Sequence, residues 1–221
     1  MNGRHELKHS VRLIDFYEIE RSLSLIASLD SHSKDGLYTV HSLYFDNYSN
    51  KVLREKKDGL NNREKFRIRF YNHDFSFINL EKKSKKNGIS HKQSTKISKS
   101  ECESILNGNY DFLKESNDPL KLEFYTKIHF QQLRPKNIVV YDRKAYIYHA
   151  GNTRVTFDFN LSTSFDIQNF FNTHRITIPI KNSIILEIKY DSFLPEIIKN
   201  LVHLQNRHSS SFSKYAASRI I

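Results

Sequence analysis

The chain has 221 residues, of which 38% are hydrophobic and 13% aromatic, a composition that excludes a disordered protein. Its one cysteine, Cys102, excludes an internal disulfide and fits a reducing compartment. Lysine and arginine number 35 against 24 acidic residues, so the formal net charge is +11. Such an excess favours a polyanionic partner, either nucleic acid, anionic lipid or a phosphate compound, although a solvated basic surface gives the same composition.

Targeting and domain signals are few. No stretch reaches the roughly 18 apolar residues that a membrane span requires, and segment 1–17 lacks the apolar core of a signal peptide. We therefore expect a cytoplasmic protein that reaches a membrane only through a separate partner. Because the chain has no internal repeat and no low-complexity linker, we expect one domain over residues 1–221.

Hydrophobic periodicity predicts strands where it alternates every second residue, and helices where it recurs every three or four residues. In chain order, the predicted strands cover residues 5–10, 38–46, 63–71, 78–83, 154–159 and 184–190. The predicted helices cover residues 15–28, 98–108, 118–134, 193–204 and 213–219. Ser98 and Glu101 form a capping box for the second helix, and Asp118 followed by Pro119 begins the third.

The strand at 63–71, REKFRIRFY, places Lys65, Arg67 and Arg69 on one face and apolar side chains on the other. At about 3.3 Å per residue, neighbouring cations on that face lie about 6.6 Å apart, a spacing similar to that of successive phosphates in an extended chain. Such a row repels itself unless an anion or an acidic strand faces it. A solvent-exposed sheet face would explain this strand if it stood alone.

Four further strands repeat the pattern of charges on one face and mostly apolar groups on the other. Glu-x-Lys recurs as Glu6/Lys8, Glu81/Lys83 and Glu187/Lys189, and the strand at 154–159 carries Arg154 and Asp158. An ordinary half-buried sheet explains one or two such strands. Five are better explained by an α+β fold built on an antiparallel β-barrel with a charged interior and an apolar exterior covered by flanking helices.

Seven motifs in this order resemble the VTC domain, the polyphosphate polymerase domain of the vacuolar transporter chaperone proteins, in its stand-alone bacterial form. This domain belongs to the CYTH, or triphosphate tunnel metalloenzyme, superfamily. The resemblance runs from Arg4 to about Arg219, and its motifs are Arg4-x-Glu6-x-Lys8, Ser42-Leu-Tyr-Phe-Asp46, Arg63-x-Lys65-x-Arg67-x-Arg69, Tyr141-x-Arg143, Arg154-x-Thr156-x-Asp158, Leu186-Glu-Ile-Lys189 and Ser213-Lys-Tyr215.

The resemblance implies a triphosphate tunnel fold that transfers the γ-phosphate of ATP to a growing polyphosphate chain with Mn²⁺ or Mg²⁺. Carried onto matching positions, it implies as catalytic phosphate clamps Arg67, Arg69, Lys83 and Arg154. Further phosphate ligands would be Lys8, Lys92, Arg143, Ser213 and Lys214, to which the charged strand faces add Lys65 and Lys189. The implied metal ligand is Glu187; Glu6, Glu81 and Asp158 are either further metal ligands or salt-bridge partners of the cations.

Elementary chemistry agrees with these roles. A triphosphate carries about four negative charges, so it needs several cations and a divalent metal, and metals of this kind prefer oxygen ligands. Phosphoryl transfer then requires positioning and charge neutralisation but no Ser, Cys or His nucleophile, so we interpret Cys102 and the eleven histidines as structural or surface residues. Two positions depart from the family: Arg4 replaces a glutamate of the hydrolases, which favours transfer over hydrolysis, and Ser211 replaces a lysine of the eukaryotic polymerases.

Two alternatives remain open at this point. The same scaffold could serve as an inorganic or nucleoside triphosphatase, because fold does not fix the nucleophile. The chain could also be a non-catalytic module that binds polyphosphate or nucleic acid. Nucleic acid is disfavoured because the aromatic side chains of strand 63–71 fall mostly on the face opposite the cations, and because no RNA-binding signature appears.

Overall fold

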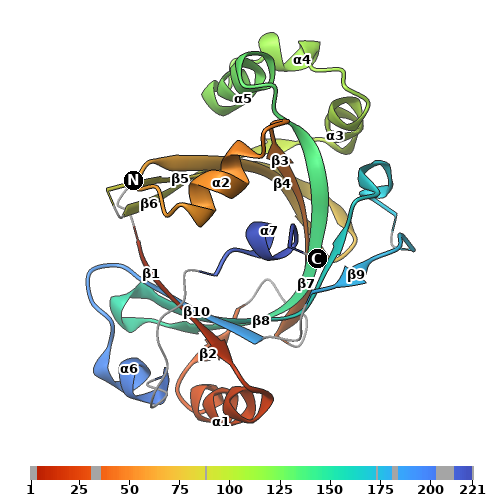
Figure 1. Ribbon diagram of the computed structural model, residues 1–221. Helices are drawn as coiled ribbons and strands as arrows, with labels where there is room; N and C mark the ends of the chain where they lie inside the picture. Colours follow the sequence, from red (N-terminus) through yellow and green to blue (C-terminus); the bar gives the residue numbers. More distant parts are fainter. Residues whose placement is uncertain are drawn as a thin grey trace. The chain divides into compact units, whose positions relative to one another are not determined.

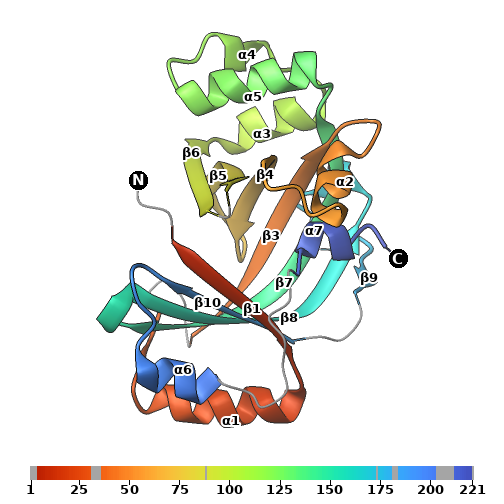
Figure 2. The same ribbon diagram turned by 60° about the vertical axis from the view of Figure 1, so that its left-hand side comes forward.

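The computed structural model describes residues 4–30, 36–87, 89–172, 174–180, 184–202 and 212–220 (Figures 1 and 2). Two compact units divide the chain, and each gathers segments that lie far apart in the sequence. The first unit comprises Met1–Thr39, Tyr141–Leu161 and Pro179–Phe212; the second comprises Val40–Val140, Ser162–Ile178 and Ser213–Ile221. The prediction of a single domain over residues 1–221 stays a prediction.

The strands are β1 (His5–Val11), β2 (Ser28–Leu29), β3 (Leu37–Asp46), β4 (Arg63–Tyr71), β5 (Asp74–Lys86), β6 (Ile89–Ile97), β7 (Arg134–Tyr148), β8 (Thr153–Ser164), β9 (Ile178–Pro179) and β10 (Ile184–Tyr190). The helices are α1 (Leu13–Ser24), α2 (Lys51–Lys57), α3 (Lys99–Leu106), α4 (Asp111–Lys114), α5 (Pro119–Phe130), α6 (Glu196–Val202) and α7 (Lys214–Ala217). The hydrogen-bonded strand order is β1-β10-β8-β7-β3-β4-β5-β6, with β2 beside β7 and β9 beside β8. Each strand pair whose register the structure gives is antiparallel.

In the first unit, the apolar face of strands β1, β10 and β8 packs against α1 and α6 (Figures 1 and 2). Phe157 of β8 and Leu186 of β10 are fully buried there together with Leu23 of α1 and Ile198 of α6. Because side chains alternate along a strand, the charged residues of the same strands are directed to the opposite face.

In the second unit, the apolar face of β3, β4 and β5 packs under α3, α4 and α5 (Figure 2). Phe124 of α5 lies at the centre of this contact, because its ring meets Phe45 edge-on at 5.0 Å and lies 5.1 Å from Phe66. The prediction that one strand face is apolar and covered by helices is thus met in each unit separately.

Several predicted elements have the bounds that the sequence indicated. The strands at 63–71 and 184–190 match β4 and β10 residue for residue. Both hydrogen bonds of the Ser98–Glu101 capping box form at α3, and the Asp118 carboxylate caps α5 by accepting from Leu120 N–H and Lys121 N–H. The helix predicted to residue 28 ends at Ser24, because residues 28 and 29 pair with β7 as strand β2.

Other elements were not predicted, each for a local reason. The helix predicted over 118–134 ends at Phe130, and β7 begins at Arg134 and includes Pro135. β6 is mostly polar on both faces. α2 has no apolar periodicity; its first turn is held by Asp46, whose carboxylate accepts hydrogen bonds from Val52 N–H and Leu53 N–H. The end of the helix predicted over 193–204 and the departure at Ser211 lie outside the described residues. None of the helices in the described ranges is long and apolar enough to cross a membrane.

The packing of α5 makes a first testable prediction. Phe124→Ala removes a fully buried aromatic side chain and should lower the free energy of unfolding by about 3–5 kcal/mol, because it leaves a cavity as well as losing buried area. Leu122→Ala, on the exposed side of the same helix at 39% exposure, is the control and should cost less than about 1 kcal/mol. Urea denaturation measures both; equal losses would contradict this account of the core.

Candidate functional site

The second unit carries a group of cations that we call the cation cluster: Lys65, Arg67 and Arg69 of β4, Lys83 of β5 and Lys92 of β6. The strand register places Lys65 directly opposite Lys83, and Lys83 directly opposite Lys92. Three lysines therefore form a row across three neighbouring strands. Like charges in directly opposed positions destabilise a sheet. This row is therefore more easily explained by binding of an anion than by a contribution of the lysines to the stability of the fold.

Glu81 lies within the cation cluster and is only 2% exposed. Arg67 donates from Nε to one carboxylate oxygen at 2.6 Å, and Lys92 Nζ lies 2.7 Å from the other. Burial alone would raise the pKa of Glu81, but Arg67, Arg69 and Lys92 outweigh burial and lower it well below its usual range. Since both oxygens already face cations, the contacts favour the salt-bridge alternative for Glu81 over the metal-ligand alternative.

Strand β3 supplies hydroxyl groups to the cation cluster. Arg69 Nε donates to Ser42 Oγ at 3.3 Å, and Arg67 Nη1 donates to the Tyr44 hydroxyl at 3.4 Å. The antiparallel register explains the pairing, because it sets Ser42 opposite Arg69 and Tyr44 opposite Arg67. Alternation along β3 thus gives the Ser-x-Tyr part of the motif a place beside the arginines. The sequence motif by itself predicted no role for Ser42 or Tyr44.

The C-terminal motif Ser213-Lys-Tyr215 lies at the start of α7 in the second unit. Ser213 caps α7 by accepting a hydrogen bond from Ala216 N–H at 3.4 Å. The buried Tyr215 donates its hydroxyl proton to Asp46 at 2.7 Å, and its ring lies 5.2 Å from that of Tyr44. Ser213 therefore has a structural task of its own, and its role as a phosphate ligand, like that of the buried Lys214, stays a prediction.

The first unit carries the Glu-x-Lys residues of β1 and β10. Lys8 Nζ lies 2.7 Å from a Glu6 oxygen and 3.6 Å from a Glu187 oxygen, while Lys189 Nζ lies 2.6 Å from the other Glu187 oxygen. Burial by itself would lower the pKa of Lys8, but the Glu187 and Glu6 charges outweigh it and raise this pKa. Lys8 is thus held as an ammonium ion between two carboxylates.

The two predicted site arginines of the first unit are paired as well. Arg143 binds both oxygens of the fully buried Asp158, from Nε at 2.5 Å and from Nη2 at 2.8 Å. Arg154 donates from Nη2 to Asp30 at 2.5 Å and to the Tyr38 hydroxyl at 2.8 Å. Because Arg143 occupies both Asp158 oxygens, the contacts again favour a salt-bridge partner over a metal ligand at this position.

The two units differ in the ratio of cations to carboxylates among their predicted site residues. In the first, the candidate cations are matched by an equal number of carboxylates: Lys8, Arg143, Arg154 and Lys189 contact Glu6, Asp30, Asp158 and Glu187. In the second, the five residues of the cation cluster share one predicted site carboxylate, Glu81, which contacts Arg67 and Lys92. Among the predicted site residues, those of the second unit thus include more cations than carboxylates.

The described part of the chain contains no group of three or more His, Cys, Asp or Glu side chains arranged to hold a metal ion. Glu187 and Glu6 both contact the Lys8 ammonium group, and both Glu187 oxygens face cations, Lys8 and Lys189, like those of Glu81 and Asp158. Mg²⁺ and Mn²⁺ are usually held by one or two carboxylates, with water and substrate oxygens completing the shell. Glu187 and Glu6 are oxygen donors of this kind, but a metal here would take the place of the ammonium groups, so their role as metal ligands stays a prediction.

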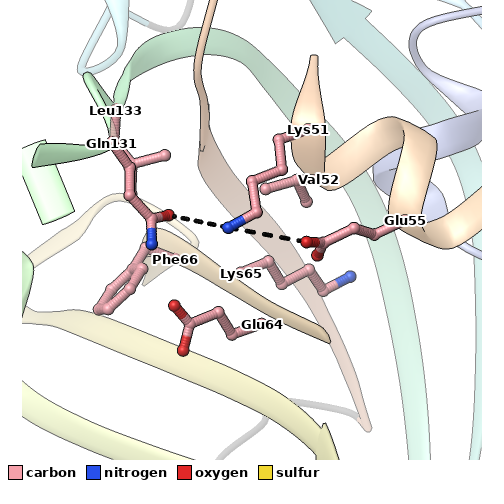
Figure 3. A pocket seen from close by; sticks show the side chains of 8 residues that line it. All are labelled: Lys51, Val52, Glu55, Glu64, Lys65, Phe66, Gln131 and Leu133. Atoms are coloured by element: carbon pink, nitrogen blue, oxygen red, sulfur yellow. Dashed lines mark hydrogen bonds and ion pairs between the residues drawn. The ribbon is translucent and has the colours of Figure 1, made fainter. Parts of the chain in front are cut away.

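A small pocket lies beside the start of β4 in the second unit, between α2 and the segment that follows α5 (Figure 3). Lys65 lines it, and Lys51 extends into it towards Gln131 Oε1 at 3.3 Å and Glu55 at 3.7 Å. Glu64, which also lines the pocket, pairs instead with Lys82 and Lys127 outside the lining. The pocket therefore adds no new ligand set to the cation cluster.

Comparison with known proteins decides the family. The family model of the VTC domain matches residues 3–220. The chain belongs to the VTC domain family. The family predicted from the sequence motifs is thus confirmed, and with it the CYTH-like superfamily, whose members usually act on phosphate compounds. A search of curated proteins found no match.

Solved structures decide the fold. A protein from Bacillus halodurans, described as a candidate adenylate cyclase, matches with a TM-score of 0.52 and 14% identity over 95% of each chain. The PH1819 protein from Pyrococcus horikoshii matches with a TM-score of 0.49 and 10% identity over 94% of each chain. The first match confirms the predicted α+β class, an antiparallel sheet of the triphosphate tunnel type with flanking helices.

The buried Arg143–Asp158 pair makes a second prediction. Asp158→Ala leaves the Arg143 guanidinium without its carboxylate and should destabilise the VTC domain by about 3–5 kcal/mol, since an uncompensated charge stays buried. Asp191→Ala removes the partner of Arg4, a pair whose side chains are 36% and 49% exposed, and should cost less than about 1 kcal/mol. Thermal unfolding followed by circular dichroism compares the two; a stable Asp158→Ala would contradict the assigned burial.

Proposed function

We propose that this VTC domain is a polyphosphate polymerase, a metal-dependent phosphotransferase that moves the γ-phosphate of ATP onto a growing polyphosphate chain. The observation that carries the proposal is the cross-strand row Lys65–Lys83–Lys92 beside Arg67 and Arg69. A polyanion with closely spaced charges offsets the repulsion in such a row. Arginine forks bind two phosphate oxygens at once, and lysines act as point charges.

The residues have distinct roles in the proposed reaction. Arg67, Arg69 and Lys83 of the second unit would neutralise charge on the transferring group. The resemblance also assigns Arg154 of the first unit as a phosphate clamp. Phosphoryl transfer depends mainly on such positioning and neutralisation. Glu187, together with Glu6, would hold Mn²⁺ or Mg²⁺, which supplies further positive charge to phosphate oxygens.

Two observations favour transfer to phosphate over the alternatives. Arg4, where hydrolases of the superfamily carry a glutamate, pairs with Asp191 at 2.8 Å and adds no carboxylate to activate water. A triphosphatase on the same scaffold is the second candidate function. A nucleic-acid module is disfavoured because Phe66 and Phe70 of β4 are each 1% exposed within the apolar core and cannot stack on bases; of the β4 aromatics, Tyr71 alone lies on the face of the cations, where it contacts Arg69.

The protein would act in the cytoplasm on ATP and polyphosphate, and would reach a membrane through a separate partner. Its product separates the two enzymatic readings. Purified protein incubated with ATP and Mn²⁺ should yield a polyphosphate ladder together with ADP. Orthophosphate without polymer would move the assignment to the triphosphatase.

Single substitutions test the assigned residues. Arg67→Ala should lower the rate of polymer formation by about 100-fold or more, a typical loss when a charge-stabilising donor is removed, and Glu187→Gln should abolish metal-dependent turnover. Arg54→Ala, an exposed arginine of α2 in the same unit, is the matched control and should keep full activity. Circular dichroism verifies that each variant is folded. Full activity in both site variants would overturn the assignment.

A further inference from the structure

Tyr44 is a buried phenol placed against the cation cluster. Its side chain is 2% exposed, and its hydroxyl lies 3.4 Å from Arg67 Nη1. The Lys65 ammonium group lies 5.5 Å from the centre of its ring. A hydroxyl beside a guanidinium group, on a ring that faces an ammonium group, is favoured as an anion where the attraction of these charges outweighs the cost of burying the phenolate.

The charged and titratable groups around Tyr44 come mainly from β4 and α7. β4 presents Lys65, Arg67 and Arg69, and Arg67 is paired with Glu81 of β5, which Lys92 of β6 also contacts. α7 presents Tyr215, whose ring lies beside that of Tyr44 and whose partner Asp46 follows on β3. Tyr215 donates its hydroxyl proton to Asp46 at 2.7 Å. Burial and Asp46 together raise the pKa of Tyr215, so this second phenol stays protonated although its ring lies 5.2 Å from that of Tyr44.

We propose that Tyr44 couples phosphate binding to proton uptake: its hydroxyl is ionised while no phosphate occupies the cation cluster, and it takes up one proton from solvent when a phosphate chain binds. The inference rests on the proposed function, namely that the cation cluster is a phosphate site. The phenolate acts as a counterion that the phosphate chain replaces. The proton comes from the buffer, and no bond to phosphorus forms or breaks in this step.

The electrostatics give the direction of the effect. Burial raises the pKa of Tyr44, but Arg67, Lys65 and Arg69 outweigh burial and lower it to about 7. A triphosphate brings about four negative charges to the same cations, which removes the stabilisation of the phenolate and raises the pKa again. Above about pH 7, phosphate binding then requires a proton, so its affinity should fall up to about tenfold per pH unit relative to a variant without this hydroxyl.

The first experiment titrates the ligand-free protein by the ultraviolet absorbance of tyrosinate. Wild type should show one tyrosine ionising at about pH 7, which Tyr44→Phe lacks and Tyr215→Phe retains. Tyr71→Phe is a required second control, because Arg69, against the effect of burial, also lowers the pKa of Tyr71. Loss of the titration step in Tyr71→Phe but not in Tyr44→Phe would overturn the proposal.

The second experiment adds tripolyphosphate, with metal removed by a chelator, at about pH 8, where Tyr44 would be mostly ionised. Calorimetry measures binding while absorbance reports tyrosinate. Wild type should lose the absorbance of about one tyrosinate per bound chain, and Tyr44→Phe should bind without this loss. Because the wild-type measurement stands alone, the test survives a variant that fails to fold.

The outcomes separate the inference from the function on which it rests. Binding with unchanged tyrosinate absorbance overturns the role of Tyr44 and leaves the phosphate site intact. Absence of binding in wild type overturns both the phosphate site and the coupling, and the ligand-free titration then shows whether Tyr44 is ionised at all.

Discussion

Repulsion between like charges on one sheet face is the constraint around which the second unit is built. Neighbouring cations of β4 lie about 6.6 Å apart, and at an effective dielectric constant of about 20 each adjacent pair costs about 2–3 kcal/mol. The row from Lys65 through Lys83 to Lys92 adds to this cost. Folded domains are stable by only about 5–15 kcal/mol, so this repulsion would destabilise the fold severely unless anions lay close to the cations. Glu81 is one such anion.

The first unit handles charge differently. Lys8 lies between Glu6 and Glu187, and Arg143 is held by both oxygens of Asp158. Such matched pairs gain little net stability once the cost of desolvation is included, but they hold carboxylates and cations in fixed positions. The cation cluster of the second unit meets one requirement of phosphoryl transfer, namely charge neutralisation on phosphate.

Local periodicity was sufficient to predict which side chains share a strand face. It placed Lys65, Arg67 and Arg69 together, and it gave β4 and β10 their bounds. Partners across strands could not be predicted, because they depend on strand order and register, which no local pattern encodes. The position of Lys92 opposite Lys83 therefore came only from the structure. The structure also revealed the structural role of Asp46, whose carboxylate joins the first turn of α2 to Tyr215 of α7.

The central claim is that the cation cluster of the second unit binds a phosphate chain without a metal ion. The most direct test is the melting temperature of the wild-type protein with increasing tripolyphosphate while a chelator removes every divalent metal. The account predicts a steady rise with ligand concentration, worth about 2.7 kcal/mol when the free ligand reaches about a hundred times its dissociation constant. A melting temperature that does not move, or that rises only after Mn²⁺ is added, would contradict it.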